Sequence, residues 1–328
     1  MAQTSAQSGL LTCGLPYARI GAGGQALVVL DGFRVEHRPA EGLVLQGMAA
    51  AYERYVEAGY TVYILERRAG MPIDYRFDDI VSDYRDGVAE LATAPPADET
   101  GVFGSDTTTS TTTSSSFLPR GPARADRVAG TDCAAGADRV AEDEPRAVDL
   151  MGIGAGGMLA LALAAERLGE ASGAPVFRRL VLTAAAARLS EKGRSAARRW
   201  LSAAEQLRWR TLHREMAQLS HPGVASLFYG AVAWLAPSLF GTTDYPWDFY
   251  ITLREVSEAD LRPRLSAVAV PALLIGGAQD ELYTAREMQE TAAGMPEAEA
   301  RVIPGAGHVV GRTRRRAVDE AILSFLSR

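Results

Sequence analysis

A glycine-rich turn at residues 152–157 has a spacing that two different chemistries use. The six residues read Gly-Ile-Gly-Ala-Gly-Gly, and they lie between an apolar run at 147–151 and an alanine- and leucine-rich stretch at 158–167. One interpretation is the G-x-S-x-G nucleophile elbow, a sharp strand–turn–helix in which close packing excludes side chains at the flanking positions. The other is the G-x-G-x-x-G fingerprint, which the segment matches literally and which seats a pyrophosphate at a helix N-terminus.

The dinucleotide interpretation fits the surrounding sequence less well. That fingerprint normally follows the first strand of its unit, and an Asp or Glu comes about 20 residues later, at the end of the next strand. Here the next apolar run, Leu180–Thr183, is followed by alanines. A dinucleotide-dependent oxidoreductase is therefore kept only as a third hypothesis, and the elbow is favoured.

Four separate segments of the chain resemble the α/β-hydrolase family. They are ALVVLDGFRVEHRP near the start, DLMGIGAGG at the glycine-rich turn, PALLIGGAQDELY late in the chain and IPGAGH near the end. The sequence is similar to serine hydrolases of the actinobacterial single-domain type, and the similarity extends over nearly the whole chain outside about 95–146. It implies an α/β-hydrolase fold, in which helices flank a mostly parallel central sheet and a helical cap is inserted.

The resemblance assigns a catalytic acid and a catalytic histidine but no nucleophile. In this family the chain order is nucleophile, acid, histidine, which makes Asp280 the acid and His308 the histidine. The carboxylate would fix the imidazole tautomer, and the imidazole would take a proton from the attacking group. Gly154 occupies the nucleophile position and has no hydroxyl, so an acyl-enzyme cannot form there. Loss of this nucleophile typically costs on the order of a million-fold in turnover.

The resemblance also places an oxyanion hole and a pocket. The two hole donors are the backbone N–H groups of Phe33 and Ala155. Asp31-Gly32 stands where many relatives have His-Gly, which brings a negative charge toward the oxyanion unless Asp31 faces solvent or pairs with Arg34. The candidate pocket residues come from the early loop and the cap, and they are His37, Trp234, Phe240, Tyr245 and Trp247.

Apolar runs that alternate with amphipathic stretches predict the elements that position these residues. Short apolar runs bounded by turn residues predict buried strands at 26–30, 61–65, 147–151, 180–183, 272–275 and 301–303. Helical spacing predicts helices at 42–58, 78–91, 158–167 and 314–326, with Gly59 as a C-cap glycine. This alternation favours right-handed βαβ units and a mostly parallel sheet.

The chain is expected to divide into five stretches. A first part of the core, at 1–94, precedes a Thr/Ser-rich insertion at 95–146 whose composition indicates disorder. The core resumes at 147–188 and ends at 263–328, which carries the acid, the histidine and a closing helix. Between these two parts, 189–262 is expected to form a helical cap. One face of a single amphipathic cap helix is predicted to carry Trp200, Leu201, Ala204, Leu207 and Leu212.

Composition and charge restrict the functional class. The 328 residues are 47% hydrophobic and 23% charged with a net charge of −6, which is typical of a soluble globular protein and disfavours nucleic-acid binding. The two cysteines, Cys13 and Cys133, provide no disulfide framework, and no apolar run is long enough to span a membrane. A cytoplasmic protein without a cofactor or metal is expected, while the oligomeric state stays open.

Two functional hypotheses precede the dinucleotide enzyme. In the first, Asp280 and His308 activate a water or act as acid and base on a small apolar substrate, giving a hydrolase-like or lyase-like enzyme without a covalent intermediate. In the second, the protein is a non-catalytic relative that binds a small apolar ligand or a partner under its cap. Assays of Gly154→Ser and His308→Ala variants separate the two.

Overall fold

An eight-stranded sheet organises the part of the chain that the computed structural model describes. The described residues are 4–31, 38–93, 146–166, 176–220, 227 and 245–328. The strands are β1 (Ala6–Leu10), β2 (Pro16–Ile20), β3 (Gln25–Leu30), β4 (Tyr60–Leu65), β5 (Val148–Ile153), β6 (Phe177–Thr183), β7 (Ala272–Gly277) and β8 (Ala298–Ile303). Their order is β1-β2-β4-β3-β5-β6-β7-β8. β1 pairs antiparallel with β2 and β2 with β4, whereas the other pairs are parallel, as the sequence predicts.

The parallel strands in the middle of the sheet contain apolar runs because both faces of the sheet are covered. In β3, Val28 and Leu30 belong to one hydrophobic layer, and Leu27 and Val29 belong to the layer on the opposite face. All four are fully buried. Burial on both faces produces the apolar runs from which such strands are predicted, and a strand is present at each of the six predicted positions.

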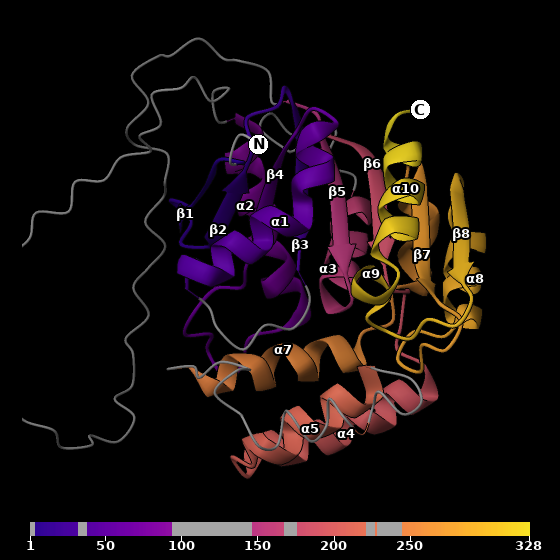
Figure 1. The fold of residues 1–328 in the computed structure, drawn as a ribbon. Helices are drawn as coiled ribbons and strands as arrows, with labels where there is room; N and C mark the ends of the chain where they lie inside the picture. The colour runs from indigo at the N-terminus through magenta and orange to yellow at the C-terminus, as the bar shows by residue number, and fades with distance from the viewer. Residues whose placement is uncertain (1–3, 32–37, 94–145, 167–175, 221–226, 228–244) are drawn as a thin grey trace, which may run out of the picture. The chain divides into compact units, whose positions relative to one another are not determined.

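Helices cover both faces of this sheet (Figure 1). The helices of the core are α1 (Gly42–Glu57), α2 (Phe77–Thr93), α3 (Ala155–Ala165), α8 (Ala285–Ala293), α9 (Val310–Thr313) and α10 (Arg315–Leu326). One hydrophobic layer contains side chains of α1 and α10, and the other contains those of α2, α3 and α8. The predicted C-cap glycine, Gly59, follows α1 and has a φ of +92°, in the region that favours glycine.

Three helices of the segment expected to form a cap, the cap helices, lie at the end of the sheet where the parallel strands finish (Figure 1). They are α4 (Glu191–Glu205), α5 (Trp209–Ser220) and α7 (Pro246–Glu258), and a 3₁₀ turn at Arg262–Ala267 leads back to the core. The prediction of one continuous helix through Leu207 and Leu212 is wrong. The chain breaks between α4 and α5, where Leu207 has a φ of +54° and is 58% exposed. Helical periodicity alone does not reveal such a break.

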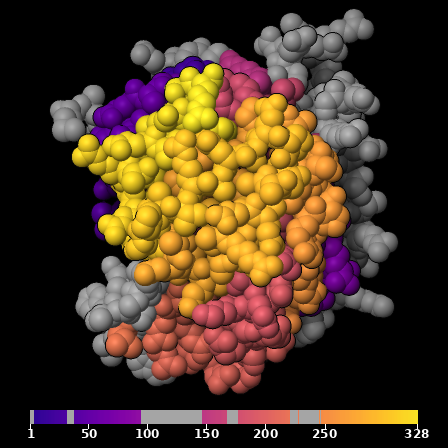
Figure 2. All heavy atoms as spheres, turned by 90° about the vertical axis from the view of Figure 1, so that its right-hand side faces the viewer, coloured from indigo at the N-terminus to yellow at the C-terminus, as the bar shows by residue number. Residues whose placement is uncertain are grey.

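The C-terminal part of the chain, from β7 onward, covers the β8 edge of the sheet. Figure 2 shows residues from β7 onward forming a continuous surface on this side, with part of the cap below them. At the end of the strands away from the cap helices, the Arg146 N–H donates to the Ala92 carbonyl at 3.0 Å. The two ends of the predicted insertion therefore meet next to the start of β5, and residues 95–145 themselves lie outside the described residues. Within the described residues, no helix is long and apolar enough to cross a membrane.

Candidate active site

The glycine-rich segment forms a tight turn from β5 into α3. Gly154 lies at this turn with a φ of +56° and a ψ of −120°. Its N–H donates to the Thr183 carbonyl at 2.9 Å, and its carbonyl accepts from the Gly157 N–H at 3.0 Å. These two bonds hold the turn between β6 and the first turn of α3.

Close packing inside the protein accounts for the glycines around position 154. A Cβ at Gly152 would lie 2.5 Å from the Gly157 Cα, and a Cβ at Gly156 would lie 2.3 Å from the Leu30 carbonyl oxygen. A Cβ at Gly157 would lie 2.3 Å from that of Ala185. The segment therefore brings α3 close against the sheet, as both the elbow and the dinucleotide interpretation require.

Asp280 follows β7 and is almost completely buried. Its Oδ1 accepts hydrogen bonds from the backbone N–H groups of Leu282 at 2.8 Å and Tyr283 at 3.1 Å. Its Oδ2 lies 2.9 Å from the Nδ1 of His308. The two backbone donors therefore fix the carboxylate so that its second oxygen points at the imidazole.

His308 lies between β8 and α9, and its ring is held on two sides. Nδ1 pairs with Asp280, and the ring stacks on Tyr283 with the centroids 5.9 Å apart and an interplanar angle of 28°. Burial of the ring lowers the pKa of His308, but the negative charge of Asp280 and the hydrogen bond to it outweigh burial and raise the pKa above its ordinary value of 6.5. In the neutral ring, a proton on Nδ1 leaves Nε2 as the acceptor.

The Nε2 atom of His308 faces the turn at Gly154. A Cβ built on Gly154 would lie 3.5 Å from Nε2 and 3.7 Å from Cε1. A serine hydroxyl at this position would come within hydrogen-bond reach of the imidazole. The structure thus brings Asp280, His308 and Gly154 together, with Asp280 on the Nδ1 side of the imidazole and position 154 on its Nε2 side.

Part of the predicted oxyanion hole lies within the described residues. Ala155 is the first residue of α3, where backbone N–H groups have no partner inside the helix, so its N–H is a donor at the turn. Phe33 and Arg34 lie outside the described residues. Asp31 is partly buried at the end of β3.

Asp31 takes part in a buried electrostatic cluster centred on Arg67. Burial lowers the pKa of Arg67, whereas the neighbouring Tyr84, Glu66, Asp248 and Asp31 act in the opposite direction. Asp248 comes from α7 of the cap, and its carboxylate accepts from the N–H groups of Gly70 and Met71, both at 2.7 Å. The charge of Asp31 therefore belongs to a set of interactions that also ties the cap to the core.

The predicted pocket aromatics are only partly described. His37, Trp234 and Phe240 lie outside the described residues. Tyr245 and Trp247, at the start of α7, are 49% and 48% exposed. The Tyr245 ring lies beside Gly70, and Trp247 packs edge-on against Tyr250 with the ring centroids 5.7 Å apart. Neither lines the cavity that contains His308.

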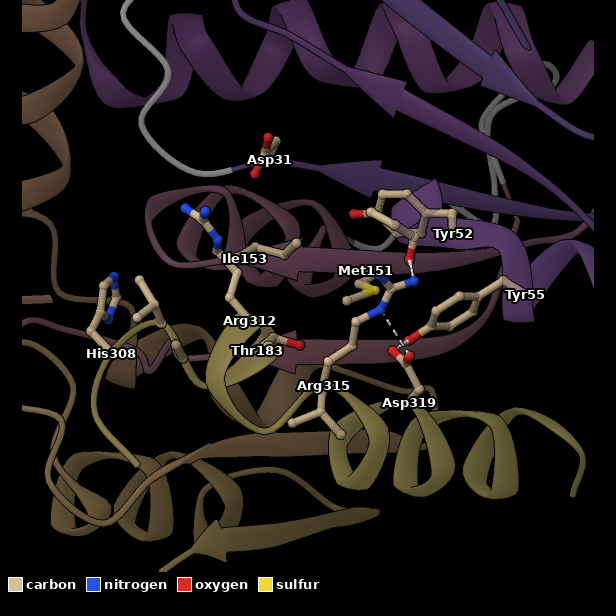
Figure 3. Close-up of a pocket in the computed structure, with 15 residues that line it drawn as sticks. Asp31, Tyr52, Tyr55, Met151, Ile153, Thr183, His308, Arg312, Arg315 and Asp319 are labelled. Carbon is tan, nitrogen blue, oxygen red and sulfur yellow. Dashed lines mark hydrogen bonds and ion pairs between the residues drawn. The ribbon is translucent and has the colours of Figure 1, made fainter. Parts of the chain in front are cut away.

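That cavity, the α1–α10 hollow, lies on the face of the sheet covered by α1 and α10 (Figure 3) and has a volume of about 450 Å³. The residues that line it are Asp31, Ala51, Tyr52, Tyr55, Met151, Ile153, Thr183, Ala184, His308, Val309, Gly311, Arg312, Arg315, Val318 and Asp319. Sequence reasoning missed all of these except Asp31 and His308. The sequence offered a signal for three of them, because Met151 and Thr183 end predicted strands and Ile153 lies in the glycine-rich turn.

A serine at the start of α4 anchors the loop that carries Asp280. The Ser190 hydroxyl accepts from the Gly193 N–H at 2.9 Å and donates to the Glu281 carbonyl at 2.5 Å. The Ser190 N–H donates to the Leu282 carbonyl at 2.8 Å. The two peptide groups whose N–H groups bind the Asp280 carboxylate thus accept hydrogen bonds from Ser190 through their carbonyl oxygens. Ser190, the N-cap of α4, therefore supports Asp280 indirectly.

Comparison with solved structures identifies the fold. MGS-M2, an α/β hydrolase enzyme from a Medee basin deep-sea metagenome library, is 14% identical with a TM-score of 0.65, over 96% of this chain and 94% of that one. An esterase from Exiguobacterium antarcticum is 15% identical with a TM-score of 0.63, over 98% and 99%. A bromoperoxidase from Bacillus anthracis is 17% identical with a TM-score of 0.63, over 99% and 100%. No protein-family model and no curated protein matches the sequence.

Proposed function

Since the chain has the α/β-hydrolase fold, we propose that it is a hydrolase that uses the Asp280–His308 pair to activate water. The observation that carries this proposal is the orientation of His308. Its Nδ1 is bound to a buried carboxylate, and its Nε2 faces a turn that has no side chain to compete for it. Such a pair is a general base, and it does not require a covalent intermediate.

The reaction follows from these positions. Nε2 accepts a proton from a water while the water oxygen attacks the substrate carbonyl carbon, and Asp280 stabilises the imidazolium that forms. The carbonyl oxygen becomes an oxyanion, to which the Ala155 N–H donates. His308 then returns the proton to the leaving alcohol as the carbon–oxygen bond breaks. A small apolar ester is the substrate class proposed for this reaction.

The test is an assay of short-chain aryl esters with the parent and with Gly154→Ser, each with and without His308→Ala. If the pair activates water, the parent hydrolyses the esters, and His308→Ala lowers kcat/KM by about 10²- to 10⁴-fold. The matched control is Glu281→Gln, because Glu281 neighbours Asp280 but its side chain is 46% exposed. This control should keep the parent's rate, whereas Asp280→Asn should not.

A non-catalytic binding protein is the second candidate, and the backbone at Gly154 favours it. A side chain at a φ of +56° is strained, so glycine both removes the nucleophile and relaxes the turn. This candidate predicts that the parent is inactive and that esterase activity emerges only in Gly154→Ser. Activity in the parent that depends on His308 would rule it out.

A further inference from the structure

The α1–α10 hollow is a cavity with a mainly apolar wall and a small number of polar groups. Met151, Ile153, Ala184, Val309 and Val318 form much of the wall. At about 450 Å³ the cavity is within the usual size range for small-molecule sites, about 300–1,000 Å³. A ligand in the hollow can bond to those polar groups of the lining that other side chains do not already occupy.

Thr183 supplies a buried hydroxyl without a partner. The residue is only 3% exposed, and among the described residues no hydrogen bond to its Oγ1 is found. It ends β6, and Figure 3 shows its hydroxyl pointing into the hollow. A buried hydroxyl that lacks a partner destabilises the folded protein, so its presence is accounted for if a ligand supplies the partner.

Arg312 supplies a cation at one end of the hollow. His308 and Asp31 lie at the same end (Figure 3). It is exposed, and within the described part of the chain its guanidinium has neither a hydrogen bond nor an ion pair. By contrast, Arg315 is occupied, because it binds the Ala51 carbonyl at 2.8 Å and Asp319 at 3.4 Å. The remaining acid, Asp31, is coupled electrostatically to Arg67.

We propose that the α1–α10 hollow binds a single-ring aromatic carboxylate that carries a second polar group on its ring. The planar guanidinium of Arg312 matches a carboxylate with two parallel hydrogen bonds. The apolar wall accommodates the ring, and the Thr183 hydroxyl bonds to the ring substituent. This site is a binding site in its own right, and its occupation does not depend on turnover at the Asp280–His308 pair.

Isothermal titration calorimetry of the full chain with three probe compounds tests the Arg312 contact and the Thr183 contact separately. They are 3-(4-hydroxyphenyl)propionate, 3-phenylpropionate, which lacks the ring hydroxyl, and 3-(4-hydroxyphenyl)propionamide, which lacks the charge. The hydroxylated acid should bind with saturation, and each of the other two should bind about 10-fold more weakly, because each leaves one protein group unpaired. Equal affinity for the acid and the amide, or no saturable binding of any probe, would overturn the proposal.

Two variants assign each contact to its residue. Arg312→Gln should abolish the preference for the acid over the amide, and Thr183→Val should abolish the preference for the hydroxylated acid over 3-phenylpropionate. The matched control is Arg316→Gln, since Arg316 is 89% exposed, pairs with Glu320 and does not line the hollow. If this control lowered the affinity for the hydroxylated acid as much as Arg312→Gln does, the effect would be one of net charge, and the assignment would be wrong. Thermal unfolding of each variant verifies that it is folded.

The calorimetric result and the esterase result are independent. Selective binding in a protein that hydrolyses no ester would support the hollow as a ligand site and remove the proposed hydrolase activity. Hydrolysis that depends on His308, without binding of any of the three probes, would support the activity and remove the ligand site.

Discussion

Gly154 has backbone angles that a residue with a side chain adopts only at a cost of about 1–3 kcal/mol. We therefore expect Gly154→Ser to lower the free energy of unfolding by an amount in this range, measured by urea denaturation, while it places a hydroxyl beside His308. Gly42→Ser is the matched control, because Gly42 also has a positive φ, +53°, and open space around it. It should lose stability without a change in esterase activity. A Gly154→Ser protein as stable as the parent would show that the turn is not strained.

Thr183 permits a test of whether its hydroxyl contributes to folding. Its Oγ1 is buried without a partner, so Thr183→Val should leave the free energy of unfolding unchanged or raise it by about 1 kcal/mol. Thr61 is equally buried, but its hydroxyl donates to the Gly23 carbonyl at 2.7 Å. Thr61→Val should therefore lower the free energy of unfolding by about 1 kcal/mol. If Thr183→Val lost as much stability as this control, its hydroxyl would have a structural partner.

His308 should titrate above pH 6.5 in the folded protein, because Asp280 stabilises its charged form more than burial destabilises it. An NMR titration of the ring protons measures this pKa directly. In Asp280→Asn the negative charge is gone while burial remains, so the pKa should fall below its value in the parent. Since a general base must be neutral, ester hydrolysis by the parent should increase with pH through the same titration. An unchanged pKa in Asp280→Asn would contradict this account.

At the scale of elements, the N-cap of α4 connects the cap to the loop that carries the acid. Ser190→Ala removes the hydrogen bonds to the Gly193 N–H and to the Glu281 carbonyl, and an N-cap change of this kind costs about 1–2 kcal/mol. We expect a loss of stability of this size in chemical denaturation, together with a lower pKa of His308, because Asp280 becomes less firmly held. Ser195→Ala is the control within the same helix, where the described residues give the hydroxyl one hydrogen bond, accepted from Arg198. It should change stability by less than about 0.5 kcal/mol.

The strands also explain which elements could be predicted. β3, β4, β6 and β7 were expected because burial on both faces produces apolar runs. β5 and β8 were expected from shorter apolar runs, although Asp149 and Arg301 lie within them. β1 and β2 were not expected, since the antiparallel edge contains Pro16 and Arg19, which interrupt any apolar pattern. Arg19 is nevertheless only 8% exposed. Its burial results from packing in the folded sheet and has no counterpart in the local sequence.

For the whole molecule, the raised pKa of His308 makes stability depend on pH. The folded state binds this proton more tightly than the unfolded state does, so the contribution to stability is complete below about pH 6.5. It is lost as the pH rises through the folded-state pKa. The difference in free energy of unfolding between the parent and His308→Gln should therefore decrease from pH 6 to pH 9. A difference that stays constant over this interval would show that the histidine is not stabilised in its charged form.

The fold class could be predicted from the sequence, and a family resemblance proposed Gly154, Asp280 and His308 as the positions of a nucleophile, an acid and a histidine. Apolar runs, glycine-rich turns and residue types are local properties, and an observer of the sequence sees them directly. How these positions meet depends on the packing of the folded chain. Asp280 and His308 are 28 residues apart, and their 2.9 Å contact depends on β7 and β8 lying side by side.

The α1–α10 hollow depends even more on the tertiary structure. Its walls come from α1, the ends of β5 and β6, and the segment 308–319, which are far apart in the chain. A cavity is the space that packed elements leave between them, so no single stretch of residues encodes it. For the same reason, the partnerless hydroxyl of Thr183 and the unoccupied guanidinium of Arg312, among the described residues, could be recognised only after the surrounding contacts were known.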